Sequence, residues 1–453
     1  MSNQLISSIS GVRGIFGSGL NPEIIVKYVN AFSRLIRGKK IIIGRDGRIT
    51  GKMISDIVSS TFQYLGYEVL DIGIAPTPTV QMGVELFCAD GGVAITASHN
   101  PIQWNGLKFL SKTGMFLNPD EYKTMMEFYE NSENGYVTWS EAGKYSLVND
   151  FSEKHLQKIL ELPYIKQKQI REKNFKIVVD CVNASGSEIV PALLKKLGCE
   201  VIKINCELNG VFPHIPEPLP QNLTELASKV VDTKADMGIA VDPDADRLVL
   251  ICEDGEPFGE EYTITQAVKF ILGKKKGNVV VNVSTTRAVD DVTKKYGGIL
   301  VKTPVGEINV AKKMKDIDAV IGGEGSGGVI LPDVHLGRDS LVGIALTLQH
   351  LVEFSGSLSQ MKRSLPEYFM SKEKVDLSSL DEAVQILGRL TDINKNENIT
   401  TMDGLRIDFE SSWVIIRRSN TEPIIRIYSE AKSIKEAKAL SEKMKKEILN
   451  LRS

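Results

Sequence analysis

Four short polar segments carry the side chains that could do chemistry. They are "TASHNP" at 96–101, "DPDADR" at 242–247, "GEGSGG" at 323–328 and "RRSNTEP" at 417–423. Together they offer hydroxyl, carboxylate, imidazole, amide and guanidinium groups. Such groups can bind a divalent cation, bind a phosphate or act as a nucleophile.

The segment "DPDADR" places Asp242, Asp244 and Asp246 at alternate positions, so the three carboxylates share one side of an extended chain. The flanking "MGIAV" and "LVLIC" predict two buried strands. Clustered carboxylates repel one another unless a cation is present, and hard oxygen ligands favour Mg²⁺ or Ca²⁺. The alternative is a polar turn, which Pro243 would suit. We predict a divalent-metal site.

Ser98 stands beside His99, the pair that a hydrolase would use as nucleophile and base. Neighbouring residues on an extended backbone point to opposite faces, so a hydrogen bond of the hydrolase kind between them would need a sharp bend, and we do not expect one. The G-x-S-x-G motif of hydrolases is absent, and the pattern after Ser98 does not lead into a helix. The other histidines have contexts typical of surface or structural residues: His155, His214, His335 and His350.

The segment "GEGSGG" has the spacing G-x-G-x-x-G, but a dinucleotide-binding loop must open a helix. The strand-like "VILP" follows instead, so we reject nucleotide binding. What remains is either an ordinary glycine-rich turn or a loop that presents Glu324 and Ser326 to sugar hydroxyls. In "RRSNTEP", arginine, hydroxyl, amide and turn N–H groups suit a phosphate dianion, although Ser-Asn is also common in hairpin turns.

Alternating strand and helix patterns predict the elements that position these loops. The order strand, helix, strand, helix, strand occurs three times, starting at "KKIIIG", "FKIVVDCV" and "NVVVNVS". This order predicts largely parallel sheets covered on both faces. In each unit the third strand runs into one of the unusual loops. Because ligands gather beyond the carboxyl ends of such strands, we expect three walls of one cleft.

The pattern changes near the carboxyl terminus. The segment "GLRIDFESSWVIIRRSNTEPIIRIYSEA" alternates like a β-hairpin, and "SIKEAKALSEKMKKEILNLR" predicts an amphipathic closing helix. We therefore predict an α/β protein with three similar mixed-sheet α/β domains and a C-terminal α+β domain around one cleft. The expected domains are 1–150, 151–253, 254–366 and 367–453.

The composition of the 453-residue chain limits its classes of partner. A formal charge of −2, from 55 basic and 57 acidic residues, gives no general argument for binding nucleic acid or an anionic membrane. The amino terminus lacks the basic start and apolar block of a signal peptide, and no run approaches the ~18 apolar residues of a membrane span. Five cysteines without a C-x-x-C pair predict buried, reduced thiols and a cytoplasmic location.

With these four loops in this order, the chain resembles the α-D-phosphohexomutase superfamily over essentially its whole length. The superfamily includes phosphoglucomutases, phosphomannomutases and phosphoglucosamine mutases. The resemblance implies interconversion of hexose 1- and 6-phosphates, of glucose or mannose, through a phosphoserine and a hexose 1,6-bisphosphate that also serves as activator. The alternatives are a phosphoglucosamine mutase or, from a different class, a metal-dependent phosphosugar phosphatase or binding protein. By family analogy the chain would be a monomer or a homodimer.

The resemblance also implies roles for individual residues. Ser98 would carry the phosphoryl group, with His99 as a supporting residue. Lys108 would be the general acid/base, and Arg13 and Arg247 would line the same reacting end of the site. Ser98 and the three aspartates would hold Mg²⁺. The sugar would contact Glu324, Ser326 and Lys302. The non-reacting phosphate would contact Arg417, Ser419, Asn420 and Thr421. Gly328 departs from the histidine of many bacterial relatives, and this glycine form is similar to archaeal members.

Overall fold

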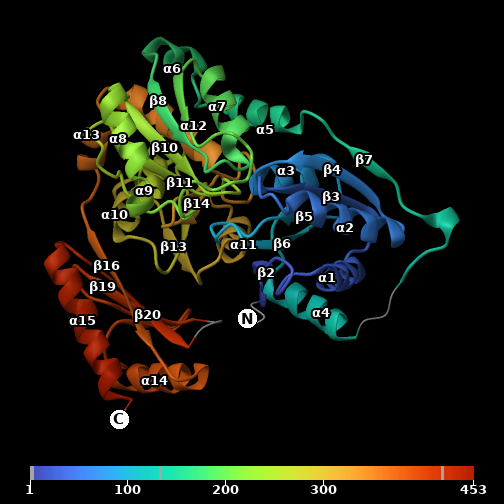
Figure 1. The fold of residues 1–453 in the computed structure, drawn as a ribbon. Helices are drawn as coiled ribbons and strands as arrows, with labels where there is room; N and C mark the ends of the chain where they lie inside the picture. Colours follow the sequence, from blue (N-terminus) through green and yellow to red (C-terminus); the bar gives the residue numbers. More distant parts are fainter. Residues whose placement is uncertain (1–4, 132–134, 420–422, 453) are drawn as a thin grey trace.

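Four sheets organise the molecule (Figure 1), a computed structural model that describes residues 5–131, 135–419 and 423–452. The first sheet has seven strands in the order β1-β2-β6-β5-β3-β4-β7, and the next two have four strands each, β11-β10-β8-β9 and β13-β12-β14-β15. The fourth has five antiparallel strands in the order β16-β20-β19-β18-β17. The predicted fold class of three mixed-sheet α/β domains and a C-terminal α+β domain is confirmed.

The bounds of the elements follow the chain order. The first domain holds β1 (Leu5–Ser8), β2 (Gly11–Ile15), α1 (Pro22–Leu35), β3 (Lys40–Arg45), α2 (Gly51–Tyr64), β4 (Glu68–Ile74), α3 (Thr77–Leu86), β5 (Gly91–Ile95), β6 (Trp104–Ser111), α4 (Pro119–Glu130), η1 (Trp139–Glu141) and β7 (Tyr145–Leu147). The second holds α5 (Phe151–Leu160), α6 (Gln167–Lys173), β8 (Lys176–Asp180), α7 (Gly186–Lys196), β9 (Glu200–Ile204), η2 (Pro220–Asn222), α8 (Thr224–Thr233), β10 (Met237–Val241) and β11 (Leu248–Cys252).

The third domain holds α9 (Glu260–Leu272), β12 (Val279–Asn282), α10 (Arg287–Lys295), β13 (Leu300–Thr303), α11 (Glu307–Asp316), β14 (Ile321–Glu324), β15 (Gly328–Ile330), α12 (Ser340–Phe354) and α13 (Leu358–Arg363). The fourth holds β16 (Phe369–Asp376), α14 (Leu380–Ile393), β17 (Ile399–Thr400), β18 (Leu405–Asp408), β19 (Trp413–Arg418), β20 (Ile424–Ala431) and α15 (Ile434–Asn450).

The first three domains repeat one four-stranded core. In each, the first strand of the unit (β3, β8 or β12) lies between two parallel partners, and a final antiparallel strand (β6, β11 or β15) completes the core. The central strands are rich in β-branched residues and are almost wholly buried, as expected for strands covered on both faces. The loop between the third and last strands of the core therefore recurs at the same edge of each sheet.

The hydrophobic cores show how the domains are joined. One cluster runs continuously from the second domain into the third, so that Leu248 and Ile264 belong to the same core. A second cluster joins the first and third domains through Ile42 and Ile308. The fourth domain has a core of its own and stands apart in Figure 1. Only the first three domains therefore share extensive apolar cores.

Trp413 marks the attachment of the fourth domain to the third. The indole is fully buried in a small cluster with Val283 and Ile415, and its Nε1 donates to Glu430 at 2.7 Å. The Arg406 guanidinium stacks 4.2 Å from the Trp413 ring centroid and donates to the Val283 carbonyl. This contact is small beside the shared cores of the other domains.

The cysteines correct one detail of the prediction. All five are free thiols, and three are buried. Cys88 is exposed, because it lies in the turn that joins α3 to β5, so the expectation of burial is wrong there. Of the helices in the described parts of the chain, none is both long and apolar enough to cross a membrane.

Candidate active site

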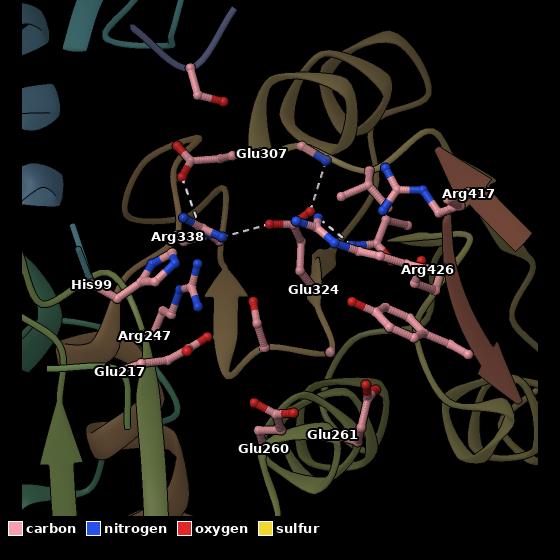
Figure 2. Close-up of a pocket in the computed structure, with 18 of the residues that line it drawn as sticks. His99, Glu217, Arg247, Glu260, Glu261, Glu307, Glu324, Arg338, Arg417 and Arg426 are labelled. Atoms are coloured by element: carbon pink, nitrogen blue, oxygen red, sulfur yellow. Dashed lines mark hydrogen bonds and ion pairs between the residues drawn. The ribbon is translucent and has the colours of Figure 1, made fainter. Parts of the chain in front are cut away.

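The loops after β5, β10 and β14 line a single cavity of ≈450 Å³, to which all four domains contribute. The predicted cleft is therefore confirmed. Figure 2 shows His99 and Arg247 on one side of this cavity, Glu324 and Arg338 in the middle, and Arg417 and Arg426 on the other side. Cationic groups thus lie at both ends and a carboxylate lies between them.

Ser98 sits on a tightly held loop at the end of β5. Its side chain is 1% exposed, its φ of 50° is left-handed, and its backbone N–H donates to Thr96 Oγ1 at 2.8 Å. The Ser98 carbonyl accepts from the buried Arg48 guanidinium at 2.6 Å, and Arg48 pairs in turn with Asp46 at 3.0 Å. These contacts hold the serine buried beside His99, which lines the cavity.

The expectation that Ser98 and His99 would not be hydrogen-bonded is wrong. Ser98 Oγ lies 3.3 Å from His99 Nδ1, because the left-handed backbone at Ser98 bends the chain. Burial, followed by the charges of Arg247 and Arg13, lowers the pKa of His99 to about 2. His99 therefore stays neutral and is too weak a base to activate the serine. Ser98 Oγ instead donates to Asp242 Oδ2 at 3.1 Å.

The three aspartates of the β10–β11 loop form a buried carboxylate cluster with ligand atoms within 4.8 Å of one another. Asp242 Oδ1 accepts from the backbone N–H groups of Asp246 and Arg247 at 3.2 Å each. Asp244 Oδ2 accepts from Lys108 and from Thr77, each at 2.5 Å. The cluster is thus held in place by neighbours from two domains.

The electrostatics of this cluster fit a divalent cation. Burial and the two neighbouring carboxylates raise the pKa of Asp242 well above its ordinary value. Burial also acts to raise the pKa of Asp244, but the adjacent Lys108 ammonium lowers it overall. Asp244 Oδ1 and Asp246 Oδ1 are buried without a hydrogen-bond partner among the described residues. Buried, unpartnered carboxylate oxygens are the donors that Mg²⁺ prefers.

Lys108 reaches the same point from β6. The register of β5 and β6 pairs Ala94 with Lys108, and the 3% exposed ammonium lies 2.5 Å from Asp244 Oδ2 and 3.5 Å from Asp246 Oδ2. Arg13, on the next strand β2, donates to Asn100 at 3.2 Å. Both line the cavity. The structure therefore brings together Ser98, the aspartates and the predicted cations of this end.

Glu324 ends β14, and both of its carboxylate oxygens accept hydrogen bonds. Its Oε1 accepts from Asn282 at 2.8 Å and from the Gly306 N–H at 2.9 Å, and its Oε2 accepts from Arg338 at 2.6 Å. Burial acts to raise the pKa of Glu324, yet the Arg338 charge and these hydrogen bonds lower it. Ser326, half-buried, lines the cavity two residues further on. The glycine-rich loop thus presents a charged carboxylate and a hydroxyl.

The fourth domain supplies the far end of the cavity. Arg417 pairs with Asp403 at 2.8 Å, and Asp403 also accepts from the Val305 N–H of the third domain at 2.8 Å. The Nε of Arg417 is buried without a hydrogen-bond partner in the described chain, which suits an incoming anion. Ser419 is buried close by, whereas Asn420 and Thr421 lie outside the described residues.

Lys302 does not line the cavity with the other predicted residues. It lies on β13, an edge strand of the third sheet, and lines a separate hollow with Thr400 and Arg406. Burial, and then the charge of Arg406, lowers its pKa. The placement expected for Lys302 is corrected: the strand directs it toward the fourth domain rather than toward the sugar loop.

Several residues of the cavity were missed by the sequence analysis. Glu307 begins α11, Arg338 precedes α12, and Glu260 and Glu261 begin α9. None belongs to a short motif, since each comes from the start of a helix in the third domain. Burial raises the pKa of Glu307 to about 7. The only available signal was the isolated Arg338 in "HLGRDS".

His155, His335 and Asp339 form a second buried cluster with potential metal ligands. Both imidazoles bond Asp339 Oδ2, His155 at 2.7 Å and His335 at 3.2 Å, and His155 Nδ1 contacts Thr79 Oγ1 at 2.9 Å. The 2.7 Å between His155 Nε2 and Asp339 Oδ2 is a hydrogen-bond distance. Two ligand atoms bound to one tetrahedral Zn²⁺ would lie roughly 3.3 Å apart. We assign this cluster a structural role in joining α3, α5 and the start of α12.

Comparison with known families accounts for the arrangement of the cavity. Four family models match consecutive parts of the chain: the phosphoglucomutase/phosphomannomutase α/β/α domains I, II and III match residues 6–135, 153–255 and 260–369, and the C-terminal domain matches residues 374–447. The chain belongs to the phosphoglucomutase/phosphomannomutase family. It is therefore an enzyme of the mutase type, an isomerase that acts as an intramolecular phosphotransferase.

Two relatives are similar to this family member over nearly its whole length. A phosphoglucomutase/phosphomannomutase of Thermococcus kodakarensis is 35% identical over 94% of this chain and 95% of its own. A protein of Methanopyrus kandleri named probable phosphoglucosamine mutase is also 35% identical, over 95% of both chains. The family is established by these matches, whereas the two names differ in the sugar.

Solved structures share the four-domain fold. A phosphoglucomutase/phosphomannomutase family protein from Burkholderia thailandensis superposes with a TM-score of 0.85 at 23% identity, covering 99% of this chain and 98% of its own. N-acetylphosphoglucosamine mutase of Aspergillus fumigatus, solved with GlcNAc-6P and magnesium, gives 0.62 at 13% identity, covering 99% and 96%. At these identities the likeness supports the fold alone.

Proposed function

We propose that the enzyme interconverts the 1- and 6-phosphates of glucose or mannose, with Ser98 as the phosphoryl carrier and a hexose 1,6-bisphosphate as intermediate and activator. One observation carries the proposal. The hydroxyl of Ser98 contacts a buried carboxylate cluster that has oxygens without a hydrogen-bond partner among the described residues. His99 and Lys108, which contact Ser98 and this cluster, line one end of a cavity whose far end is lined by arginines. A carrier serine at one end and an anion site at the other suit a sugar with two phosphates.

The residues of the cavity bind and orient the substrate in this proposal. Arg417 and Ser419, with Asn420 and Thr421, hold the phosphate that does not react. Between the two ends, Glu324 accepts hydrogen bonds from sugar hydroxyls, and the Ser326 hydroxyl donates to them or accepts from them. Arg13 and Arg247 neutralise the phosphoryl group near Ser98. Binding at both ends aligns the acceptor oxygen of the sugar with the carrier, which is the main requirement for phosphoryl transfer.

Transfer exchanges one bond to phosphorus for another. The bond between phosphorus and Ser98 Oγ breaks, and a bond forms between phosphorus and the sugar oxygen. The proton of that sugar hydroxyl passes to Lys108 Nζ, which enters this half as the neutral amine and leaves it as the ammonium. In the second half the bisphosphate gives its other phosphoryl group back to Ser98, and Lys108 returns the proton to the oxygen released. Because there is a single carrier, the bisphosphate must turn round between the two halves, so one anion site accepts either end.

The carboxylates of Asp242, Asp244 and Asp246, together with Ser98, are the residues that would hold Mg²⁺. When bound, the cation supplies charge stabilisation for the transferring phosphoryl group. Asp244 and Asp246 each keep one oxygen without a hydrogen-bond partner among the described residues, and Asp242 contacts the Ser98 hydroxyl. The contact of this carboxylate cluster with the Ser98 hydroxyl supports the proposed metal site.

A phosphoglucosamine mutase is the second candidate, favoured by the name of the Methanopyrus kandleri relative. Carboxylates of Glu217 and Glu260 line the same cavity, and such groups would attract a protonated sugar amine. Coupled assays on the 1-phosphates of glucose, mannose and glucosamine would rank the three substrates. A preference for glucosamine 1-phosphate of more than about tenfold in kcat/KM would replace the first proposal with the second.

The decisive test of the mutase proposal compares the native enzyme with Ser98→Ala, each supplied with Mg²⁺ and a hexose 1,6-bisphosphate. We expect turnover of glucose 1-phosphate to glucose 6-phosphate in the native enzyme and its loss in the variant. Full turnover in Ser98→Ala would exclude the phosphoserine route. Release of inorganic phosphate, without isomerisation, by the native enzyme would instead indicate the phosphatase alternative.

A further inference from the structure

Arg338 binds three carboxylates at once in the middle of the cavity. Its Nε donates to Glu307 at 3.1 Å, its Nη1 to Glu324 at 2.6 Å and its Nη2 to Asp246 at 2.5 Å. Figure 2 shows the guanidinium between Glu307 and Glu324, with a bond to each. Each nitrogen serves a different partner, so this one side chain connects the carboxylate cluster of the second domain with the glycine-rich loop of the third.

The contact with Asp246 leaves one of its oxygens available. Arg338 and, at 3.5 Å, Lys108 both engage Oδ2. Oδ1 is buried without a hydrogen-bond partner in the described chain, with Arg247 Nε at the longer distance of 3.8 Å. On Glu324, Arg338 holds Oε2 while Asn282 and Gly306 hold Oε1. The same guanidinium therefore restricts the orientation of a candidate metal ligand and of a candidate sugar ligand.

The glycine at position 328 makes room for this arrangement. A Cβ added there would lie 2.3 Å from Arg338 Cδ and 2.9 Å from Cγ, closer than side-chain atoms approach. Gly328 starts β15, opposite Glu324 in the antiparallel pairing with β14. Any side chain at 328 would push the arginine stem off its path. Gly328 thus leaves open the space that the Arg338 stem occupies.

The network also extends to the first domain. Glu307 accepts from Arg338 on one oxygen and from Gln81 of α3 at 2.8 Å on the other. Gln81 itself is 1% exposed. Arg338 thereby lies in a chain of hydrogen bonds that joins three domains around the cavity. A lysine could keep the charge but not the fork of three donors.

We propose that Arg338 is a positioning residue that orients Asp246 for the cation and Glu324 for the sugar at the same time, in space that Gly328 leaves open. This inference rests on the proposed roles of those two carboxylates. Loss of an outer partner of a metal ligand typically costs 10–100-fold in metal affinity or activity. A perturbation of Arg338 should therefore weaken two ligands that do not share a binding loop.

Two variants perturb Arg338 in different ways. Arg338→Lys keeps the positive charge and removes the fork, while Gly328→Ala keeps the arginine and displaces its stem. Gly388→Ala is the matched control, because a Cβ there meets nothing within 4 Å. Binding of Mg²⁺ and of glucose 1-phosphate would be measured by calorimetry in a Ser98→Ala background, which prevents turnover. We expect both variants to bind both ligands about 10–100-fold more weakly and Gly388→Ala to bind them normally.

The double variant Gly328→Ala/Arg338→Lys separates positioning from general damage. If Gly328 acts only by making room for Arg338, the two substitutions remove the same interaction. The double variant should then bind each ligand at most about threefold more weakly than whichever single variant binds it less tightly. Multiplicative losses would overturn the proposal, as would unchanged binding in Arg338→Lys or a loss confined to one ligand. Because these are binding measurements, they still test Arg338 if the native enzyme proves not to be a mutase, a result that turnover would show separately.

Discussion

Replacement of Lys108 by methionine removes the only ammonium that contacts the aspartate cluster in the described structure. The Nζ lies 2.5 Å from Asp244 Oδ2, and both side chains are at most 3% exposed. Loss of a positioned general acid/base lowers turnover by 10²–10⁴-fold, equivalent to about 3–5 kcal/mol in the activation barrier. Breaking one partner of a buried ion pair also costs about 3–5 kcal/mol of stability. We expect both losses in Lys108→Met.

The assay separates these two losses. A coupled assay of glucose 1-phosphate isomerisation gives kcat and KM, and thermal unfolding with and without Mg²⁺ gives the change in stability. The loss of activity should appear as a lower kcat. Saturating Mg²⁺ should reverse much of the decrease in the thermal unfolding midpoint, because the bound cation neutralises carboxylates that the ammonium neutralises in the native protein. Lys112→Met, at an exposed position after the same strand, is the control. A kcat within about threefold of the native value in Lys108→Met would refute the proton-transfer role.

Three further perturbations test other parts of the account. Chelation by EDTA should abolish turnover, and Mg²⁺ at 100 times its Kd should add about 2.7 kcal/mol to the native stability; an equal stabilisation of Asp242→Asn/Asp244→Asn by Mg²⁺ would place the ion elsewhere. Trp413→Ala should lower the free energy of unfolding by about 3–5 kcal/mol, because it removes packing at the junction of the third and fourth domains. It should also raise KM for glucose 1-phosphate without changing Mg²⁺ affinity. An unchanged KM in steady-state kinetics would count against phosphate binding by the fourth domain. Burial lowers the pKa of His350 to about 4, below its unfolded value of about 6.5, so its contribution to stability is present above pH 6.5 and is lost as the pH falls toward 4. His350→Gln should therefore have a thermal midpoint that falls less than the native one between pH 6.5 and 4, and parallel pH profiles would contradict this.

The repeated order of strands and helices allowed the fold and the cleft to be predicted. Apolar strands such as "KIIIGR" and "KIVVD" mark buried parallel sheets, and loops at their carboxyl ends must meet at one edge. The domain limits near residues 150, 253 and 366 stay predictions, as does the choice between a monomer and a homodimer. Within the fourth domain, periodicity predicted the hairpin of β19 and β20, but β16 and α14 were not recognised individually.

The candidate site was predictable only where its residues stand together in the sequence. Asp242 and its neighbours share one loop, and the structure keeps them together. The bend at Ser98 was not predictable, because a left-handed serine depends on contacts such as Arg48 with its carbonyl. Lys302 was misplaced because its direction depends on how the edge strand β13 meets the fourth domain. Arg338 was missed because its three partners are distant in the sequence.

Intact-mass analysis of the purified enzyme gives the most direct test of the central claim. The protein would be incubated with glucose 1,6-bisphosphate and Mg²⁺, freed of sugar, weighed, and digested to map any modified peptide. The account predicts one phosphoryl group per chain, located on Ser98 and absent in Ser98→Ala. A phosphoryl group on another residue, or isomerisation by a protein that never carries one, would contradict the account.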